Sequence, residues 1–221
     1  MQNQILIGTG FYAGPENIIE LGEFLSLWRA NTARVSDNIV IADNSEGFCT
    51  NAEAYLPNCR HVRIWNNLGH AGDPISQTAS TPLLGWSMSW MIPALIAYSE
   101  KCDFIYKEQD CLAFGDWLPI VRQGAATIGR NDVMPCEQSL FYIRHDYILT
   151  FVRNYLCLGE HDAVMSTEEK FRRVMEQSGG MVQFHDLPGG RNRPLPDLTK
   201  PFYLQRITPD EMQTLKNANL I

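Results

Sequence analysis

Short apolar runs that end in polar residues recur along the first half of the chain, and they predict buried strands. The runs lie at residues 4–8, 38–45, 61–69 and 103–110. Each apolar stretch is too short for a typical helix and is closed by Gly, Asn, Asp or Ser, which is the pattern of a strand buried in a sheet and followed by a loop. We therefore expect four strands of one sheet in this half.

Two segments between these strands have helical character. Residues 16–31 carry apolar positions at helical spacing that begin just after Pro15, and proline favours the first turn of a helix. Residues 83–101 are apolar on most faces, as expected for a helix packed against a sheet, and we expect Pro93 to kink this helix or to start a new segment. Alternating strands and helices predict a mainly parallel sheet with helices on both faces.

The second half of the chain has a less regular pattern. Residues 139–156 begin like a strand and end like a helix, and residues 166–180 predict a helix that stops at Gly. Residues 181–186 predict a short strand. The segment that follows, residues 187–198, is rich in Pro, Gly and Arg and predicts a mobile loop.

Composition narrows the function classes. The chain has 221 residues, 45% hydrophobic and 19% charged, which suits one compact domain. A net charge of −7 argues against a general nucleic-acid or anionic-membrane binder and leaves small molecules or proteins as partners. The six cysteines include no CxxC pair, so neither a zinc site nor a disulfide scaffold is expected. We expect a soluble, cytoplasmic protein, since the sequence shows no signal peptide and no membrane span.

Candidate chemistry gathers where the predicted strands end, because ligands of such sheets bind beyond the carboxyl ends of the strands. Glu108 and Asp110 are one residue apart at the end of an apolar run. Two such carboxylates suit a hard divalent ion that prefers oxygen ligands and keeps open positions for phosphate. The alternative is that Glu108 is a solvated strand end and Asp110 a turn residue.

The order and spacing of these polar groups resemble nucleotide-sugar glycosyltransferases of the GT-A fold, in particular the family-2-like group. The segments that carry the resemblance are "IADNS" at residues 41–45, "NNLGHAG" at residues 66–72, and Glu108-x-Asp110. In that group, motifs like DNGS, N-x-G-x-A-G and D-x-D stand at these places. The resemblance covers residues 4–117. It implies an α/β, GT-A (nucleotide-diphospho-sugar transferase) fold in one domain, with a nucleotide-binding half at about residues 1–117 and an acceptor and catalytic half at about residues 118–221.

The resemblance also implies how a nucleoside diphosphate sugar would bind. Asp43 would accept a hydrogen bond from the base, and the loop at residues 9–11 would border the base and ribose. An ordinary Asx turn is the alternative for Asp43. The nucleotide contacts implied in this half of the chain are Thr9, Gly10, Phe11, Asp43, Asn44, Asn66, Asn67 and Gly69, with Glu108 beside the diphosphate.

A manganese or magnesium ion, held by Glu108 and Asp110 across the diphosphate, is a further implication of the resemblance. The first Asp of the family motif is Glu here and Lys107 stands beside it, a departure that weakens the expectation of metal dependence and makes Asp110 the closer match. Related enzymes often complete the metal shell with a late histidine, and His185 is similar in kind. A structural histidine is the alternative.

Two arginines follow in a glycine-hinged segment. Related enzymes often cover the diphosphate with a basic flexible loop, and Arg191 and Arg193 are placed to do so. A loop that closes on phosphate would exclude water from the labile donor. The alternative is that both arginines are solvated.

A transferase that inverts the anomeric centre needs a carboxylate as general base for the acceptor hydroxyl. The nearest match to the family's acidic pair at a late helix is "STEEKF", with Glu169 at the base position and Glu168 before it. Ser166-x-x-Glu169 is also a capping-box pattern, and if the box forms, Glu168 is the freer acid. Asp162 is a further candidate, and the acceptor would be a glycan or another hydroxyl compound.

Two other functions fit the same pattern. Sugar-phosphate nucleotidyltransferases share the sheet and the metal chemistry, but they usually carry an Arg in a Gly-rich first loop and a downstream Lys, and "IGTGFYAGPEN" contains neither. A GT-A-like protein that binds a nucleotide or glycan without turnover is the other alternative, motivated by Glu108 and the short chain. Trp86 and Trp90 are expected in the core rather than as sugar platforms.

Overall fold

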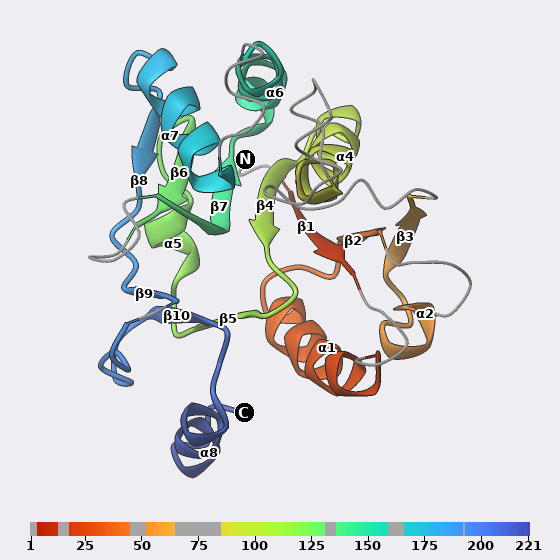
Figure 1. The fold of residues 1–221 in the computed structure, drawn as a ribbon, viewed down its shortest axis with the longest axis vertical. Coiled ribbons are helices and arrows are strands. Elements are labelled where there is room, and N and C mark those ends of the chain that lie inside the picture. Colours follow the sequence, from red (N-terminus) through yellow and green to blue (C-terminus); the bar gives the residue numbers. More distant parts are fainter. Residues whose placement is uncertain are drawn as a thin grey trace.

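The protein is built around a seven-stranded sheet (Figure 1). The computed structural model describes residues 4–12, 18–44, 52–64, 85–130, 136–158, 166–191 and 193–221. The strands of the sheet are β1 (Ile5–Phe11), β2 (Ile39–Asp43), β3 (Arg60–Arg63), β4 (Asp103–Lys107), β6 (Ala126–Gly129), β7 (Glu137–Ile143) and β8 (Val182–Phe184). Their order is β3-β2-β1-β4-β7-β6-β8. All neighbouring strands run parallel except β7, which is antiparallel to β4 and to β6. The predicted mainly parallel sheet is therefore confirmed.

Helices cover both faces of the sheet, as predicted. Figure 1 shows α4 (Gly85–Ser99), α6 (Ile148–Leu156) and α7 (Thr167–Gln177) above it, and α1 (Ile18–Ala33) and α2 (Ala52–Tyr55) below it. A 3-10 turn, η2 (His145–Tyr147), leads into α6, and the short α5 (Leu118–Val121) precedes β6. None of the described helices is both long and apolar enough to cross a membrane.

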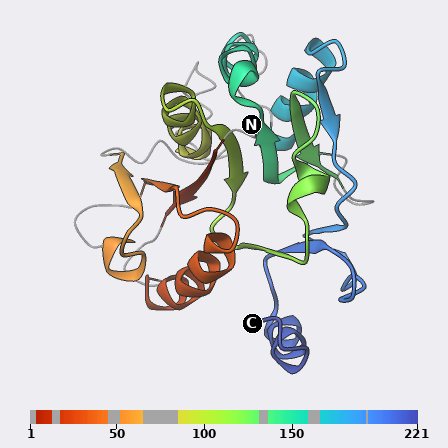
Figure 2. The same ribbon diagram turned by 180° about the vertical axis from the view of Figure 1, so that it is seen from behind.

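A second, three-stranded sheet lies beyond the end of β4, where the chain leaves the main sheet (Figure 2). It consists of β5 (Cys111–Phe114), β10 (Phe202–Gln205) and β9 (Gly189–Gly190), in the order β5-β10-β9. The chain then ends in α8 (Pro209–Asn217). The small sheet thus carries residues from the end of the chain to the edge where β4 ends.

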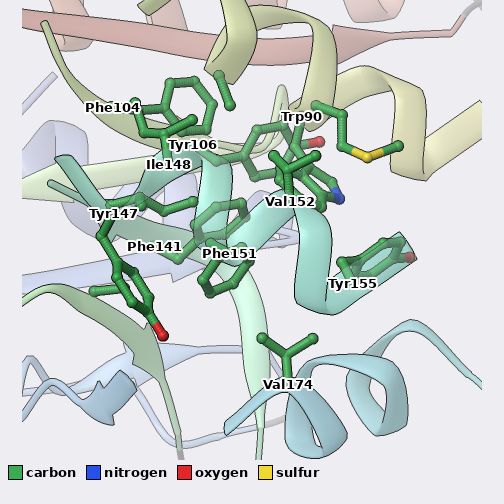
Figure 3. Packing of buried hydrophobic residues seen from close by; sticks show 14 of the residues in the cluster. Trp90, Phe104, Tyr106, Phe141, Tyr147, Ile148, Phe151, Val152, Tyr155 and Val174 are labelled. Carbon is green, nitrogen blue, oxygen red and sulfur yellow. The ribbon is translucent and has the colours of Figure 1, made fainter. Parts of the chain in front are cut away.

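Alternation along the strands sorts the apolar side chains onto two faces. Phe104 packs with α4, α6 and α7, and its neighbour Ile105 packs with α1 and the small sheet. On the first face Trp90 is fully buried, and its ring contacts four aromatic rings at centroid distances of 5.1 to 5.9 Å (Figure 3). The prediction that Trp90 belongs to the core is confirmed.

One detail of the sequence prediction is wrong in this region, and one of the two alternatives for Pro93 is excluded. Residues 9–11, which we expected to form a loop, belong to β1. The strand continues to Phe11 because it stays paired with β2 up to the Phe11–Asp43 pair. The helix at residues 85–99 is a single element that contains Pro93 and does not restart there. A β-carbon on Gly8 would overlap Pro93, so the glycine lets β1 approach this helix closely.

Several short elements gave no usable signal in the sequence. β5, β6, β9 and β10 have four residues or fewer each, and such strands are too short for a periodic pattern. β9 lies in the segment that we expected to be a mobile loop. Gly189 adopts a φ of 140°, and a β-carbon there would overlap the carbonyl oxygen of Tyr203. Only glycine fits this close approach of β9 and β10.

A buried ion pair fixes the beginning of β4. Asp103 is 2% exposed and accepts hydrogen bonds from Arg122 Nε and Nη2 at 3.0 and 2.6 Å. It also accepts from the Tyr142 hydroxyl at 3.0 Å and the His145 N–H at 3.1 Å. Asp103 therefore joins β4 to β7, to the segment after α5 and to η2.

We expect Asp103→Ala to lower the free energy of unfolding by about 3–5 kcal/mol, because it leaves the half-buried Arg122 guanidinium, the Tyr142 hydroxyl and the His145 N–H without their acceptor. Urea denaturation measures the loss. The matched control is Asp146→Ala. The Asp146 side chain is 64% exposed and pairs with Arg144, so its loss should cost about 0–1 kcal/mol. Equal stability losses in the two variants would contradict a structural role for Asp103.

Candidate functional site

Glu108, the residue after β4, is bonded to four other elements. Its N–H donates to the Ser139 carbonyl of β7 at 2.9 Å, and its carbonyl accepts from Trp28 Nε1 of α1 at 2.8 Å. Its carboxylate accepts from Trp86 Nε1 of α4 at 2.7 Å and from the Gln205 amide of β10. The position of this carboxylate is therefore set by helices and strands on both faces of the sheet.

The reversed direction of β7 brings more polar residues to the edge of the sheet where β4 ends, which we call the polar edge. Lys107 pairs with Leu140, so the first residues of β7 lie beside the last residue of β4 and the turn that follows it. In a parallel pair these residues would lie at the opposite edge of the sheet. The structure thus places Glu137, Gln138 and Ser139 next to Glu108.

Asp110 lies beside Glu108 and shares a donor with it. Its Oδ1 accepts from Gln205 Nε2 at 3.3 Å, and the same amide donates to Glu108. Burial raises the pKa of Glu108 to about 8, helped by the negative charge of Asp110 and opposed by the Trp86 hydrogen bond. Burial also raises the pKa of Asp110, and the Gln205 hydrogen bond opposes it. We call Glu108 and Asp110 the acidic pair, and either a shared proton or a bound cation would stabilise it.

Lys107 does not neutralise the acidic pair, although it is adjacent in sequence. Its side chain points to the opposite face of the sheet and is fully buried. Nζ donates to Asn31 Oδ1 at 2.5 Å and to Thr32 Oγ1 at 2.9 Å, and it lies 5.2 Å from the centroid of the Trp28 ring. Burial lowers the pKa of Lys107 to about 7.

The ends of β2 and β1 meet the end of β4 along one edge. Asp43, the last residue of β2, is 6% exposed and pairs with Phe11. The Asn44 N–H donates to the Phe11 carbonyl at 2.8 Å, and the Tyr12 N–H donates to Gln109 Oε1 at 3.2 Å. With one strand between them, the ends of β2 and β4 are separated by about 10 Å, a distance that an extended nucleoside diphosphate can span.

Of the other residues expected to contact a nucleotide, only some can be placed. The side chains of Thr9 and Phe11 are buried within the sheet, so this part of β1 offers no side-chain contact to a ligand. A β-carbon on Gly10 would overlap Ser89 of α4, and the glycine therefore serves close packing. The remaining residues, Asn66, Asn67 and Gly69, lie outside the described residues, as does Asp162.

The two glutamates at the start of α7 point in different directions. The Ser166 hydroxyl caps the helix by accepting the Glu169 N–H at 3.2 Å, as the sequence pattern predicted. The Glu169 carboxylate does not return to the cap. It accepts from Arg172 on the same helix at 2.8 Å and is 43% exposed. Glu168 instead accepts from Gln138 Nε2 of β7 at 3.3 Å, so Glu168 is the acid that faces the sheet edge.

The two arginines are also separated. The Arg191 guanidinium pairs with Glu168, and its Nε lies 3.8 Å from Glu137 Oε2. The Arg193 guanidinium pairs with Glu211 of α8, and its Nε donates to the Gly190 carbonyl at 2.9 Å. Arg191 therefore joins the polar edge, and Arg193 ties β9 to α8. Both arginines are ion-paired in this structure, which differs from the open loop that we expected.

His185 is not arranged as a metal ligand. It is 1% exposed, its Nε2 lies 3.1 Å from the Leu140 carbonyl, and burial lowers its pKa to about 4. Within the part of the chain that the structure describes, no three His, Cys, Asp or Glu side chains form a group that could hold a metal ion. The structure thus does not bring His185 together with the acidic pair. The carboxylate oxygens of Glu108 and Asp110 are nevertheless the kind of ligands that Mn²⁺ or Mg²⁺ prefers.

Sequence reasoning missed the residues that β7 and β10 bring to this edge. Glu137 and Gln138 come directly before the apolar run of β7. Glu108 and Asp110 come directly after the apolar run of β4, which is antiparallel to β7. That symmetry was readable from the sequence. Gln205 gave no signal, since nothing in its neighbourhood shows that it lies beside a turn 97 positions away.

The fold is similar to that of several sugar-nucleotide enzymes. A putative glucose-1-phosphate thymidylyltransferase from Bacillus anthracis has a TM-score of 0.51 at 6% identity, over 97% of this chain and 94% of that chain. An active-site variant of LgtC has a TM-score of 0.51 at 11% identity, over 93% of this chain and 88% of that chain. The glycosyltransferase GlyE from Streptococcus pneumoniae gives 0.50 at 9% identity, over 96% of this chain and 56% of that chain.

Searches with protein-family models and against curated proteins each found no match. Identities this low support a statement about the fold alone. The predicted GT-A fold is confirmed. Since the similar structures include a nucleotidyltransferase and glycosyltransferases by name, the fold does not select between these reactions.

The raised pKa of Glu108 predicts a pH-dependent stability. Between the ordinary glutamate pKa of 4.5 and the folded value of about 8, the folded protein keeps the proton that the unfolded chain releases. The free energy of unfolding should therefore fall as pH rises through this range and level off above it.

Glu108→Gln should reduce this slope and stabilise the protein at pH 8 by about 1–3 kcal/mol in the presence of EDTA. Urea denaturation between pH 5 and 9 provides the measurement. Glu176→Gln, on the exposed face of α7, is the matched control and should leave the slope unchanged. The same slope in wild type and Glu108→Gln would show that Glu108 ionises normally.

Proposed function

We propose that this protein transfers a sugar from a nucleoside diphosphate sugar to a hydroxyl acceptor. The observation that carries the proposal is the acidic pair, Glu108 and Asp110, held half-buried at the sheet edge that also carries Asp43. Two carboxylates at such an edge repel each other and bind a cation favourably. A diphosphate leaving group carries negative charge and needs the same cation.

The acidic pair fits Mn²⁺ or Mg²⁺ as the cation. Asp110 and Glu108 would hold the ion, and the Gln205 amide that already touches both carboxylates orients them. When bound, the ion supplies charge stabilisation to the departing diphosphate. The raised pKa values of both acids agree with this role, because a cation would take the place of a proton.

Asp43 would receive the base at the other end of the same edge. It lies two strands away from the acidic pair, across the end of β1. Arg191 adds a second positive charge near the diphosphate, since it contributes to lowering the pKa of both Glu108 and Asp110. Arg193 is directed at α8 and has no part in this proposal.

An inverting transfer needs a base on the acceptor side, and Glu168 is the better placed of the two candidates. It accepts from Gln138 and Arg191 at the polar edge. Glu169 is turned away and paired with Arg172. We assign the general-base role to Glu168 on this geometry.

The two alternatives share the fold and differ in chemistry. A nucleotidyltransferase must bind a triphosphate, and the first strand and loop carry no Arg or Lys for it. A protein that only binds would keep donor affinity and lack turnover. Slow release of nucleoside diphosphate from a nucleotide sugar in water supports the transferase, and binding without such hydrolysis supports the binding protein.

Asp110→Asn tests the acidic pair directly. Titration calorimetry with UDP and GDP, with and without MnCl₂, should show that Mn²⁺ strengthens wild-type binding of one of them at least about tenfold. We expect the variant to lose this gain without losing stability, since Asp110 packs no core and the substitution removes a charge that burial disfavours. Asp116→Asn, in the exposed turn after β5, is the control. An unchanged Mn²⁺ effect in Asp110→Asn, or no binding of any nucleoside diphosphate, would reject the proposal.

Glu168→Gln and Glu169→Gln separate the two candidate bases. The rate of donor hydrolysis at saturating nucleotide sugar should fall about 100-fold in Glu168→Gln, with donor affinity changed little. Glu169→Gln should lose far less, because among the described residues its carboxylate bonds to Arg172 of the same helix. The opposite ranking would return the base role to Glu169.

A further inference from the structure

Glu137, at the start of β7, is a buried carboxylate with little compensation. It is 0% exposed, and neither of its oxygens makes a hydrogen bond of good geometry within the described residues. Arg191 Nε lies 3.8 Å away, and the Arg191 charge together with weak hydrogen bonds from the Ser139 side chain and the Arg191 backbone offsets part of the cost of burial. Burial dominates and raises the pKa of Glu137. Such a buried, poorly bonded carboxylate is uncommon in folded proteins and calls for a ligand or an ordered water.

Two glutamine side chains add further unpaired oxygens. Gln138 and Gln205 are each 5% exposed, and Oε1 of each lacks a hydrogen-bond partner among the described residues. Their amide orientation is not arbitrary, because each Nε2 donates to carboxylates, which accept when ionised. The unpaired atoms of Glu137, Gln138 and Gln205 are therefore all acceptors. We call these three residues the acceptor subsite.

The acceptor subsite is continuous with the acidic pair. Gln205 touches Glu108 and Asp110, and the Glu108 N–H bonds to the Ser139 carbonyl, two positions from Glu137. A group attached to a diphosphate at the acidic pair would enter this subsite next. The inference therefore rests on the proposed function and concerns the group that is transferred.

The chemistry of the subsite limits what that group can be. A buried acceptor is satisfied only by O–H or N–H donors, and a phosphate group brings acceptors and negative charge instead. Negative charge is already concentrated here, since among the described residues Glu137 and Glu168 share one guanidinium, that of Arg191. A further negative charge, brought by the ligand, would lower the affinity roughly several-fold. Sugar hydroxyls bring donors without charge.

We infer that Glu137, Gln138 and Gln205 bind the hydroxyl groups of the donor sugar and select a neutral sugar over one that carries a carboxylate. Glu137 accepts from sugar hydroxyls, with the two glutamine oxygens as further acceptors. Glu168 and Arg191 close the subsite on the side of α7. A uronic acid is rejected because its carboxylate would stand against Glu137 and Glu168, and the described residues of the subsite offer no cation beyond Arg191, which already pairs with both.

Calorimetry in MnCl₂ tests this selection. The probes are UDP and GDP alone, the neutral donors UDP-glucose, UDP-galactose, UDP-N-acetylglucosamine and GDP-mannose, and the acidic donors UDP-glucuronic acid and UDP-galacturonic acid. We expect at least one neutral sugar to bind about tenfold tighter than its parent diphosphate. The acidic sugars should bind no tighter than UDP.

Glu137→Gln shows whether the subsite is responsible. This variant should lose most of the roughly tenfold gain from the neutral sugar and keep the affinity for UDP or GDP. It removes a buried charge and should therefore fold. Gln138→Ala provides a second, independent loss in the same direction, and Glu176→Gln is the control on the outer face of α7.

The outcomes separate this inference from the proposed function. No binding of UDP or GDP rejects both. Binding of a diphosphate with no gain from any neutral sugar, or an equal gain from acidic sugars, overturns the acceptor subsite and leaves the diphosphate site standing. An unchanged neutral-sugar gain in Glu137→Gln also overturns it.

Discussion

The hydrogen bonds of Glu108 are the constraint on which the site depends. They tie one carboxylate and its backbone to α1, α4, β7 and β10 at once. Burying this acid raises its pKa to about 8 and costs stability at neutral pH. A chain selected only for stability would place a neutral residue there. The arrangement makes sense if a rigidly held carboxyl group that exchanges its proton for a cation is worth its cost, as it is where a cation must be bound at a defined point.

The reversed strand β7 explains why so many polar groups meet at one edge. In a wholly parallel sheet, the start of β7 would lie far from the end of β4. Reversal places Glu137 and Gln138 beside Glu108, and β10 adds Gln205 from the end of the chain. The result is an edge with two different surfaces. The acidic pair suits a bridging cation and a charged diphosphate, and the acceptor subsite suits an uncharged, hydroxyl-bearing group. A nucleotide sugar has these two parts in the same order.

The sequence was most informative where a long pattern or a strand end carried the signal. The apolar runs predicted β1, β2 and β4, and the helical spacing predicted α1, α4 and α7. The acidic pair followed from the rule that ligands meet strands at their carboxyl ends. Elements held by close glycine contacts, such as β9, were missed because a backbone approach leaves no periodic trace.

The choice between neighbouring acids lay beyond the sequence for a different reason. The Ser166 cap was correctly predicted, but which glutamate faces the sheet depends on how α7 is rotated against β7. His185 looked like a late metal ligand in sequence, and its burial against the Leu140 carbonyl appears only in three dimensions. In both cases tertiary packing decides which groups the side chain contacts.

A crystal structure of the protein with UDP or GDP and Mn²⁺, with anomalous data to locate the metal, tests the central claim most directly. We predict an anomalous peak bonded to Asp110, with the diphosphate on its far side and the base turned toward Asp43. A nucleotide bound at another face of the molecule, or manganese located away from the end of β4, would contradict the account.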